Sequence, residues 1–321
     1  MRTQLSFALI AAAFACSFHV APAQARARTF VASYGNDSNP CTFLSPCRNF
    51  QQAVNVVDAG GEVTAIDSAG FGPISITKAV TITSPDGVEA GIVPVAGGDA
   101  IDISAGPSDA IVLRGLTLDG AGVGLNGIAF STGSSVTITN CVVAHSAYNG
   151  HAATGNGILI QPPSGSAKLT IANTIIANNA NRGIYFLEPQ FFSAQTVNVV
   201  VDHVTVTGNF VGLELPSFAG GTVVAVSNTT VSSNFATGLA VGGSGLYIID
   251  NVTSVENGGV GIDAIGASTV LLSRSVIAGN LVGIQNETSP NTFYTYGNNL
   301  IDFNSSANIG NSPLNTSTHL Q

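Results

Sequence analysis

The chain has 321 residues, of which only 8% are charged, and its formal net charge is −9. Charged residues make up about 25% of an ordinary globular protein, so this one has an unusually uncharged surface. Lysine and arginine together number nine, too few for the basic patches that contact phosphate groups. We therefore expect no nucleic-acid partner.

The first segment is typical of an exported protein. An apolar stretch over 5–20 is followed by Ala23-Gln24-Ala25, a small-residue cleavage pattern of the secretory type. The apolar stretch is shorter than the roughly 20 residues that span a bilayer. We predict a signal peptide over 1–25, a secreted or periplasmic mature chain and no membrane span within it.

Residues 26–62 are predicted to form an N-terminal cap. Cys41 and Cys47 lie close together in a polar loop, and because export favours oxidation we expect a disulfide between them. Cys141 lies in an apolar strand pattern and is expected to be a buried free thiol. A short helix is predicted over 48–57, with these apolar residues on one face: Phe50, Ala53, Val54 and Val57.

Between residues 127 and 284 the sequence repeats a Gly-Ile or Gly-Leu pair every 22 to 30 residues, a period typical of a solenoid. The pairs start at Gly127, Gly157, Gly183, Gly212, Gly238, Gly261 and Gly283. Short β-branched runs between them, such as 136–139 and 246–249, are typical of strands. We predict a parallel β-helix over 63–303 and a C-terminal tail over 304–321.

Two columns of asparagine recur in register with these glycines. One stands three or four residues before the glycine: Asn179, Asn209, Asn234, Asn257 and Asn280. The other fits about six residues earlier in each coil: Asn140, Asn173, Asn228, Asn251 and Asn298. Asparagine tolerates a left-handed backbone, and amides in coils about 4.8 Å apart can hydrogen-bond to each other. We predict that the second column forms an amide ladder inside the rod.

Two charged residues fall in the same column by spacing. We expect His203 to be a hydrogen-bonded member of the ladder, separated from Asp202 because adjacent strand residues point to opposite faces. At Arg274 we expect a local register slip, because burying a lone guanidinium is costly.

The N-terminal segment carries a resemblance to a known family. The matching residues are Phe30-Val31-Ala32, Gly35, Asp37, Asn39-Pro40-Cys41, Pro46-Cys47-Arg48, Phe50-Gln51, Ala53-Val54 and Gly60-Gly61. This segment resembles the opening of bacterial right-handed parallel β-helix repeat proteins of the pectin lyase-like superfamily. The resemblance implies an all-β, right-handed parallel β-helix with a short N-terminal cap helix. It does not imply one activity, because the superfamily includes lyases, hydrolases, epimerases and adhesins.

The motifs of the superfamily's enzymes are mostly missing. Pectate lyases carry a calcium-binding acidic cluster with a neighbouring arginine, whereas this sequence shows isolated arginines at Arg114, Arg182 and Arg274. Of the polygalacturonase motifs, only Gly150-His151-Ala152 is faintly similar to one, and the two carboxylate motifs are missing. We expect neither a metal site nor a cofactor.

The candidate ligand site lies on the outer face just after the repeated glycines. The residue two positions after each glycine should share one outward column: Ala129, Leu159, Tyr185, Glu214, Ala240, Asp263 and Gln285. Arg182 lies next to it, and an insertion over 145–151 should overhang it. We predict a sugar site formed by Tyr148, His151, Arg182, Tyr185 and Glu214. The simpler interpretation is that these are solvated residues of a sheet face.

The leading hypothesis is a secreted protein that binds polysaccharide or a cell surface. The alternative is a lyase or epimerase that acts on an acidic polysaccharide, and an adhesin is a third possibility. The sequence does not choose the glycan.

Overall fold

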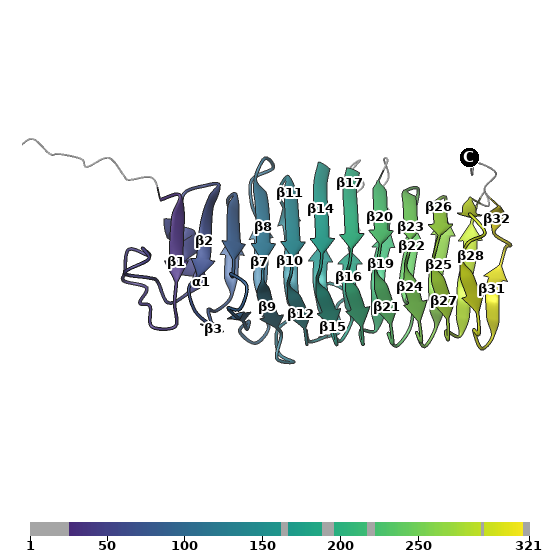
Figure 1. Cartoon of the computed structure of the whole chain (residues 1–321), viewed down its shortest axis with the longest axis horizontal. Coiled ribbons are helices and arrows are strands. Elements are labelled where there is room, and N and C mark those ends of the chain that lie inside the picture. Colours follow the sequence, from purple (N-terminus) through teal and green to yellow (C-terminus); the bar gives the residue numbers. More distant parts are fainter. Residues whose placement is uncertain (1–25, 162–165, 188–195, 217–221, 290–291, 317–321) are drawn as a thin grey trace, which may run out of the picture.

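The computed structural model describes residues 26–161, 166–187, 196–216, 222–289 and 292–316. The strands of these residues form three parallel sheets, and Figure 1 shows their coils stacked side by side from the purple N-terminal end to the yellow C-terminal end. The predicted all-β, right-handed parallel β-helix is confirmed. The predicted signal peptide over 1–25 lies outside the described residues.

Each coil contributes one strand to each sheet over most of the rod. Sheet 1 contains β1 (Arg28–Val31), β2 (Gly61–Ala65), β5 (Val80–Thr83), β8 (Ala110–Arg114), β11 (Ser135–Thr139), β14 (Ser166–Ala172), β17 (Thr196–Asp202), β20 (Val223–Ser227), β23 (Leu246–Asp250), β26 (Thr269–Ser273), β29 (Phe293–Thr295) and β32 (Asn315–Thr316). Sheet 2 contains β4 (Ile74–Ile76), β7 (Ile101–Ser104), β10 (Asn126–Thr132), β13 (Asn156–Ile160), β16 (Arg182–Phe186), β19 (Val211–Pro216), β22 (Leu239–Gly242), β25 (Val260–Gly266), β28 (Val282–Thr288) and β31 (Ala307–Asn311). Sheet 3 contains β3 (Ala69–Gly70), β6 (Ala90–Ile92), β9 (Leu116–Asp119), β12 (Val142–Ala144), β15 (Ile175–Ala177), β18 (Thr205–Thr207), β21 (Thr230–Ser232), β24 (Thr253–Val255), β27 (Val276–Ala278) and β30 (Leu300–Asp302).

The repeated Gly-Ile pair sets the packing of sheet 2. The aliphatic member of the pair points inward, and these side chains stack as a fully buried column: Ile128, Ile158, Ile184, Leu213, Leu239, Ile262 and Ile284. Burying each contributes about 1.5–3 kcal/mol. The glycine is required by close approach, because a Cβ on Gly183 would lie 2.6 Å from the carbonyl oxygen of Gly212 in the next coil.

The N-terminal end is closed by helix α1 (Phe50–Val56). The predicted apolar face is confirmed, since Phe50, Ala53 and Val54 are buried and the Phe50 ring packs 5.0 Å from that of Phe71. The expected disulfide joins Cys41 to Cys47, and Cys141 is a free buried thiol.

At the C-terminal end the stack of coils continues past the predicted boundary at residue 303. Strands β31 and β32 pair in register with β28 and β29, and Ile309 aligns with Ile284. The prediction of a tail is therefore wrong for the described residues 304–316. In the described part of the chain, no helix is long and apolar enough to cross a membrane.

The predicted amide ladder belongs to the other asparagine column. Corner 1 joins each sheet 1 strand to the following sheet 3 strand, and its asparagines are exposed: Asn140, Asn173, Asn228, Asn251 and Asn298. Corner 2 joins sheet 3 to sheet 2, and its asparagines are buried: Asn179, Asn209, Asn234, Asn257 and Asn280. The carboxamide nitrogen of each corner 2 asparagine donates to the carboxamide oxygen of the next at 2.9–3.1 Å.

The backbone conformation explains this exchange. Asn140, for example, has φ of +54°, and such a residue turns its own side chain outward while the following residue, Cys141, points inward. At corner 2 the positive φ falls one residue before the asparagine, as at Ser233 before Asn234. The left-handed bend was predicted correctly, but the predicted inside position of the column from Asn140 to Asn298 was wrong.

His203 and Arg274 are corrected for the same reason. Both have positive φ and exposed side chains at corner 1, so neither is a buried ladder member. The His203 Nδ1 atom lies 2.7 Å from Asp202 Oδ2, so the two side chains are not separated. The expected register slip at Arg274 is absent, because Ser273 pairs directly with Asp250 and the following strand stays in register.

Candidate functional site

Sheet 2 brings three of the five predicted ligand residues together. Its register places Tyr185 beside Glu214, and Arg182 starts the same strand as Tyr185. The Arg182 Nε atom donates to Glu214 Oε2, and the guanidinium lies 4.1 Å from the centre of the Tyr185 ring. A further bond of 2.9 Å joins Arg182 Nη1 to Asn181 Oδ1. The result is a compact, half-buried ion pair stacked on an aromatic ring.

Tyr185 is more covered than the sequence suggested. It is only 8% exposed, because Arg182 lies over its ring. Its ring therefore supports the guanidinium instead of offering a free face to a sugar.

The insertion loop lies beside this ion pair. Asn181 Nδ2 donates to the carbonyl oxygen of Thr154 at 3.0 Å, and Asn181 is the residue that also accepts from Arg182. A Cβ built on Gly155 would lie 2.9 Å from the Cβ atoms of both Tyr148 and Asn181. Tyr148 and His151 are themselves exposed on the loop. The loop thus reaches the site through Asn181.

The strand register confirms that the predicted residues from Ala129 to Gln285 share one column, although Ala129 and Leu159 at its start are buried. Along it, a pocket of about 250 Å³ opens over β19, β22 and β25. Its lining residues are Val211, Glu214, Thr237, Ala240, Val241, Gly242, Asp263 and Ile265. Ala240 lies in the coil between those of Glu214 and Asp263. The backbones of Glu214 and Asp263 are therefore two coil spacings, or roughly 10 Å, apart. We call this the sheet 2 pocket.

Asp263 is the unusual group of the sheet 2 pocket. Burial, with a smaller contribution from the nearby charge of Glu287, raises the pKa of the Asp263 carboxyl to about 6. Within the described residues, its Oδ1 atom is buried and has no hydrogen-bond partner. A buried acceptor without a donor costs free energy, and the Asp263 side chain therefore has unused capacity to accept hydrogen bonds where it lines the pocket.

Two phenylalanines lie close in sequence to residues that line the same pocket. Phe210 directly precedes the lining residue Val211, and Phe235 lies two residues before Thr237. Their rings stack at 5.6 Å with an interplanar angle of 24°, and Phe235 is 77% exposed. The sequence reasoning missed them, although the repeated Asn-Phe at the same position of two consecutive coils was a usable signal.

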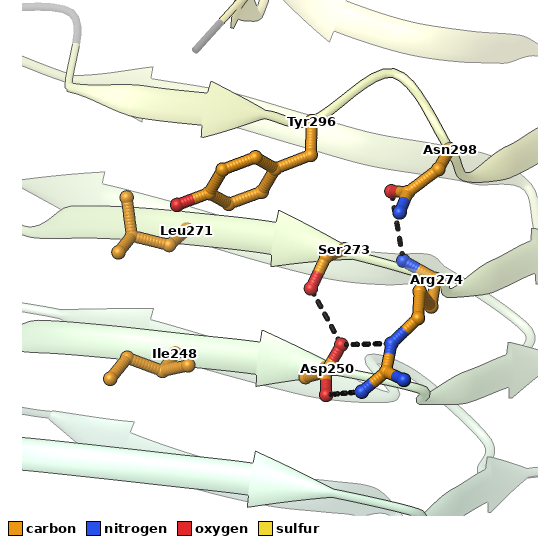
Figure 2. A pocket seen from close by; sticks show the side chains of 7 residues that line it. All are labelled: Ile248, Asp250, Leu271, Ser273, Arg274, Tyr296 and Asn298. Atoms are coloured by element: carbon orange, nitrogen blue, oxygen red, sulfur yellow. Dashed lines mark hydrogen bonds and ion pairs between the residues drawn. The ribbon is translucent and has the colours of Figure 1, made fainter. Parts of the chain in front are cut away.

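A second pocket lies on the outer face of sheet 1. It has a volume of about 410 Å³, and its lining residues are Ile248, Asp250, Leu271, Ser273, Arg274, Tyr296 and Asn298. Figure 2 shows Arg274 reaching back to Asp250 in the preceding coil. Ser273 Oγ also donates to Asp250 at 2.6 Å, and Asn298 accepts from the Arg274 backbone at 3.1 Å. We call this the sheet 1 pocket; its polar groups bind each other.

The Asp202–His203 pair at corner 1 is likewise structural. Hydrogen bonds from Ser227 and Asn228, then from His203, lower the pKa of Asp202 to about 2. The Ser227 hydroxyl donates to Asp202 and not to the imidazole, so the arrangement does not activate a serine nucleophile. Among the described residues, no three His, Cys, Asp or Glu side chains are grouped as metal ligands.

Comparisons with known proteins agree with the geometry. Neither a protein-family model nor a curated protein matches the sequence. Among solved structures, a rhamnogalacturonan lyase is 11% identical with a TM-score of 0.50, and the match covers 90% of this chain and 86% of that chain. The pectate lyase Pel9A is 14% identical with a TM-score of 0.49, over 91% and 78% of the two chains. A polygalacturonase from Erwinia carotovora ssp. carotovora is 14% identical with a TM-score of 0.42, over 92% and 97%.

At such low identity the likeness concerns architecture alone. The three parallel sheets, together with the match to the rhamnogalacturonan lyase, show that this chain has a right-handed parallel β-helix fold.

Proposed function

We propose that the protein binds polysaccharide along the outer face of sheet 2, without turning it over, after export and removal of residues 1–25. The observation that carries this proposal is the sheet 2 pocket, where Glu214 and Asp263 stand on either side of the small residue Ala240. The exposed stacked rings of Phe210 and Phe235 come from residues one and two positions before the lining residues Val211 and Thr237. Carboxylates accept hydrogen bonds from sugar hydroxyls, and aromatic rings pack against the C–H faces of sugars.

The parallel coils suit a polymer better than a small molecule. Equivalent outward positions recur about every 4.8 Å along sheet 2, so an extended chain that runs along the rod meets a new row of side chains at each coil. Individually weak contacts then add along the polymer.

Arg182 does not suit the lyase or epimerase alternative. Either reaction needs a group that removes a proton from a sugar carbon. An arginine side chain stays charged in proteins, and Arg182 is also paired with Glu214 and stacked on Tyr185.

Retention of the purified full-length protein in gels that contain polysaccharide tests the proposal. Phe235→Ala should weaken retention about fivefold, because an aromatic contact contributes about 1 kcal/mol. Leu281→Ala is the matched control, since Leu281 also follows a buried corner 2 asparagine and is exposed, but it lies two coils beyond Phe235 and next in sequence to none of the residues that line the sheet 2 pocket. Equal losses in both variants, or no retention on any polysaccharide, would contradict the proposal.

A further inference from the structure

We propose that the sheet 2 pocket selects polysaccharides that carry hydrogen-bond donors and no carboxylates, namely neutral or amino-sugar polymers, and disfavours acidic ones. This inference rests on the proposed function and names its ligand class. It follows from the charges of sheet 2, the occupied guanidinium of Arg182 and the unpartnered oxygen of Asp263.

The strands of sheet 2 are acidic. Within the described residues, these strands carry four carboxylate side chains and one cationic side chain, that of Arg182. The carboxylates are Asp102, Glu214, Asp263 and Glu287. One positive charge against four negative charges leaves a formal net charge of −3 when all are ionised. A polymer with a carboxylate on each sugar would meet like charge along this face.

The positive charge of Arg182 is not free to attract an anionic sugar and so does not offset the negative charge of sheet 2. Its Nε atom binds Glu214, its Nη1 atom binds Asn181 Oδ1 at 2.9 Å, and one face of the guanidinium covers Tyr185. Its side chain is 19% exposed. A uronate that took this guanidinium would have to displace Glu214 and leave that carboxylate unpaired.

Asp263 adds a directional requirement. Its buried Oδ1 atom accepts no hydrogen bond from the described residues, and the neighbouring Gln285 donates its amide to Glu287 at 2.9 Å. A sugar hydroxyl or ammonium group can donate to Asp263, whereas a sugar carboxylate would place one acceptor against another. The pocket therefore matches a donor-bearing, uncharged or cationic glycan.

The test compares retention of the full-length protein on xylan, chitosan and polygalacturonate at pH 7, each at low and high salt. We expect retention on xylan or chitosan to be at least about tenfold stronger than on polygalacturonate. The salt dependence of retention distinguishes the two kinds of ligand. High salt screens charges, so it should weaken retention on cationic chitosan but not retention on neutral xylan.

The variant Asp263→Asn/Glu287→Gln removes two negative charges from sheet 2. It should reduce the ratio of retention on xylan or chitosan to retention on polygalacturonate by about threefold or more. Asp86→Asn/Glu89→Gln removes two charges outside sheet 2 and should leave it unchanged. Strongest retention on polygalacturonate would overturn this inference while leaving polysaccharide binding intact. An unchanged preference in the first variant would also overturn it. Retention on none of the polymers would overturn the proposed function itself.

Discussion

Corners 1 and 2 of the rod are built from the same residue type but differ in what asparagine does there. At corner 1, Asn251 donates to Asn228 at 2.8 Å in solvent. At corner 2, Asn234 is 1% exposed and donates to Asn257 at 2.9 Å inside the rod. The difference arises from a one-residue shift of the positive φ position, which decides whether an amide satisfies the core or the surface.

The carboxylates of the sheet 1 and sheet 2 pockets show a parallel contrast. Asp250 accepts from Arg274 and Ser273, and the hydrogen bond from Arg274 is the main cause of its lowered pKa. Asp263 has a buried oxygen without a partner among the described residues, and burial raises its pKa. Polar groups that satisfy each other hold coils together, whereas the Asp263 carboxyl keeps unused capacity to accept hydrogen bonds at the wall of the sheet 2 pocket.

Replacing a buried corner 2 asparagine should have the largest effect on the free energy of unfolding. It would also show how the roles of asparagine differ between the two corners. In Asn234→Ala, the backbone N–H of Asn209 loses its acceptor, which lies at 3.1 Å. A buried donor left unpaired costs about 1–3 kcal/mol, so the free energy of unfolding measured by urea titration should fall by about 2 kcal/mol. Asn228→Gly at corner 1, where glycine adopts the positive φ without strain, should change it by less than about 0.5 kcal/mol. Similar losses in the two variants would refute the assignment of inside and outside.

A smaller, pH-dependent effect is expected at Asp263. A carboxyl whose pKa is raised from 3.8 to about 6 in the folded protein contributes stability that is fully present below pH 4 and is lost as the pH rises through 6. Because the side chain is partly exposed, we discount the full shift to about 1 kcal/mol. Asp263→Asn should therefore be more stable than the wild type by about 1 kcal/mol at pH 8 and equally stable at pH 4, as measured by urea titration. A gain of the same size at both pH values would show that ionisation is not its cause.

Much of the fold could be predicted because its determinants are periodic. The Gly-Ile pairs fixed the register of sheet 2, and that register placed Tyr185 beside Glu214 as expected. The apolar face of the cap helix was read correctly from the spacing of Phe50 and Ala53. The side to which each asparagine column points was not predictable from spacing, because it depends on which single residue adopts a positive φ.

The candidate site was only partly predictable for a similar reason. Spacing identified the column that contains Asp263, but not that its Oδ1 atom would be buried without a donor. That property depends on neighbours in adjacent coils, which lie more than 20 residues away in sequence. Phe210 and Phe235 were missed because a phenylalanine in a repeat is expected to be buried, whereas these two lie on an outer corner.

Hydrogen–deuterium exchange with and without a retained polysaccharide tests the central claim most directly. If the polymer lies on sheet 2, the backbone amides of residues 210–214 and 235–240 should exchange more slowly in its presence, while those of 271–274 in the sheet 1 pocket should be unchanged. Slower exchange at 271–274, with none at the sheet 2 pocket, would contradict the account.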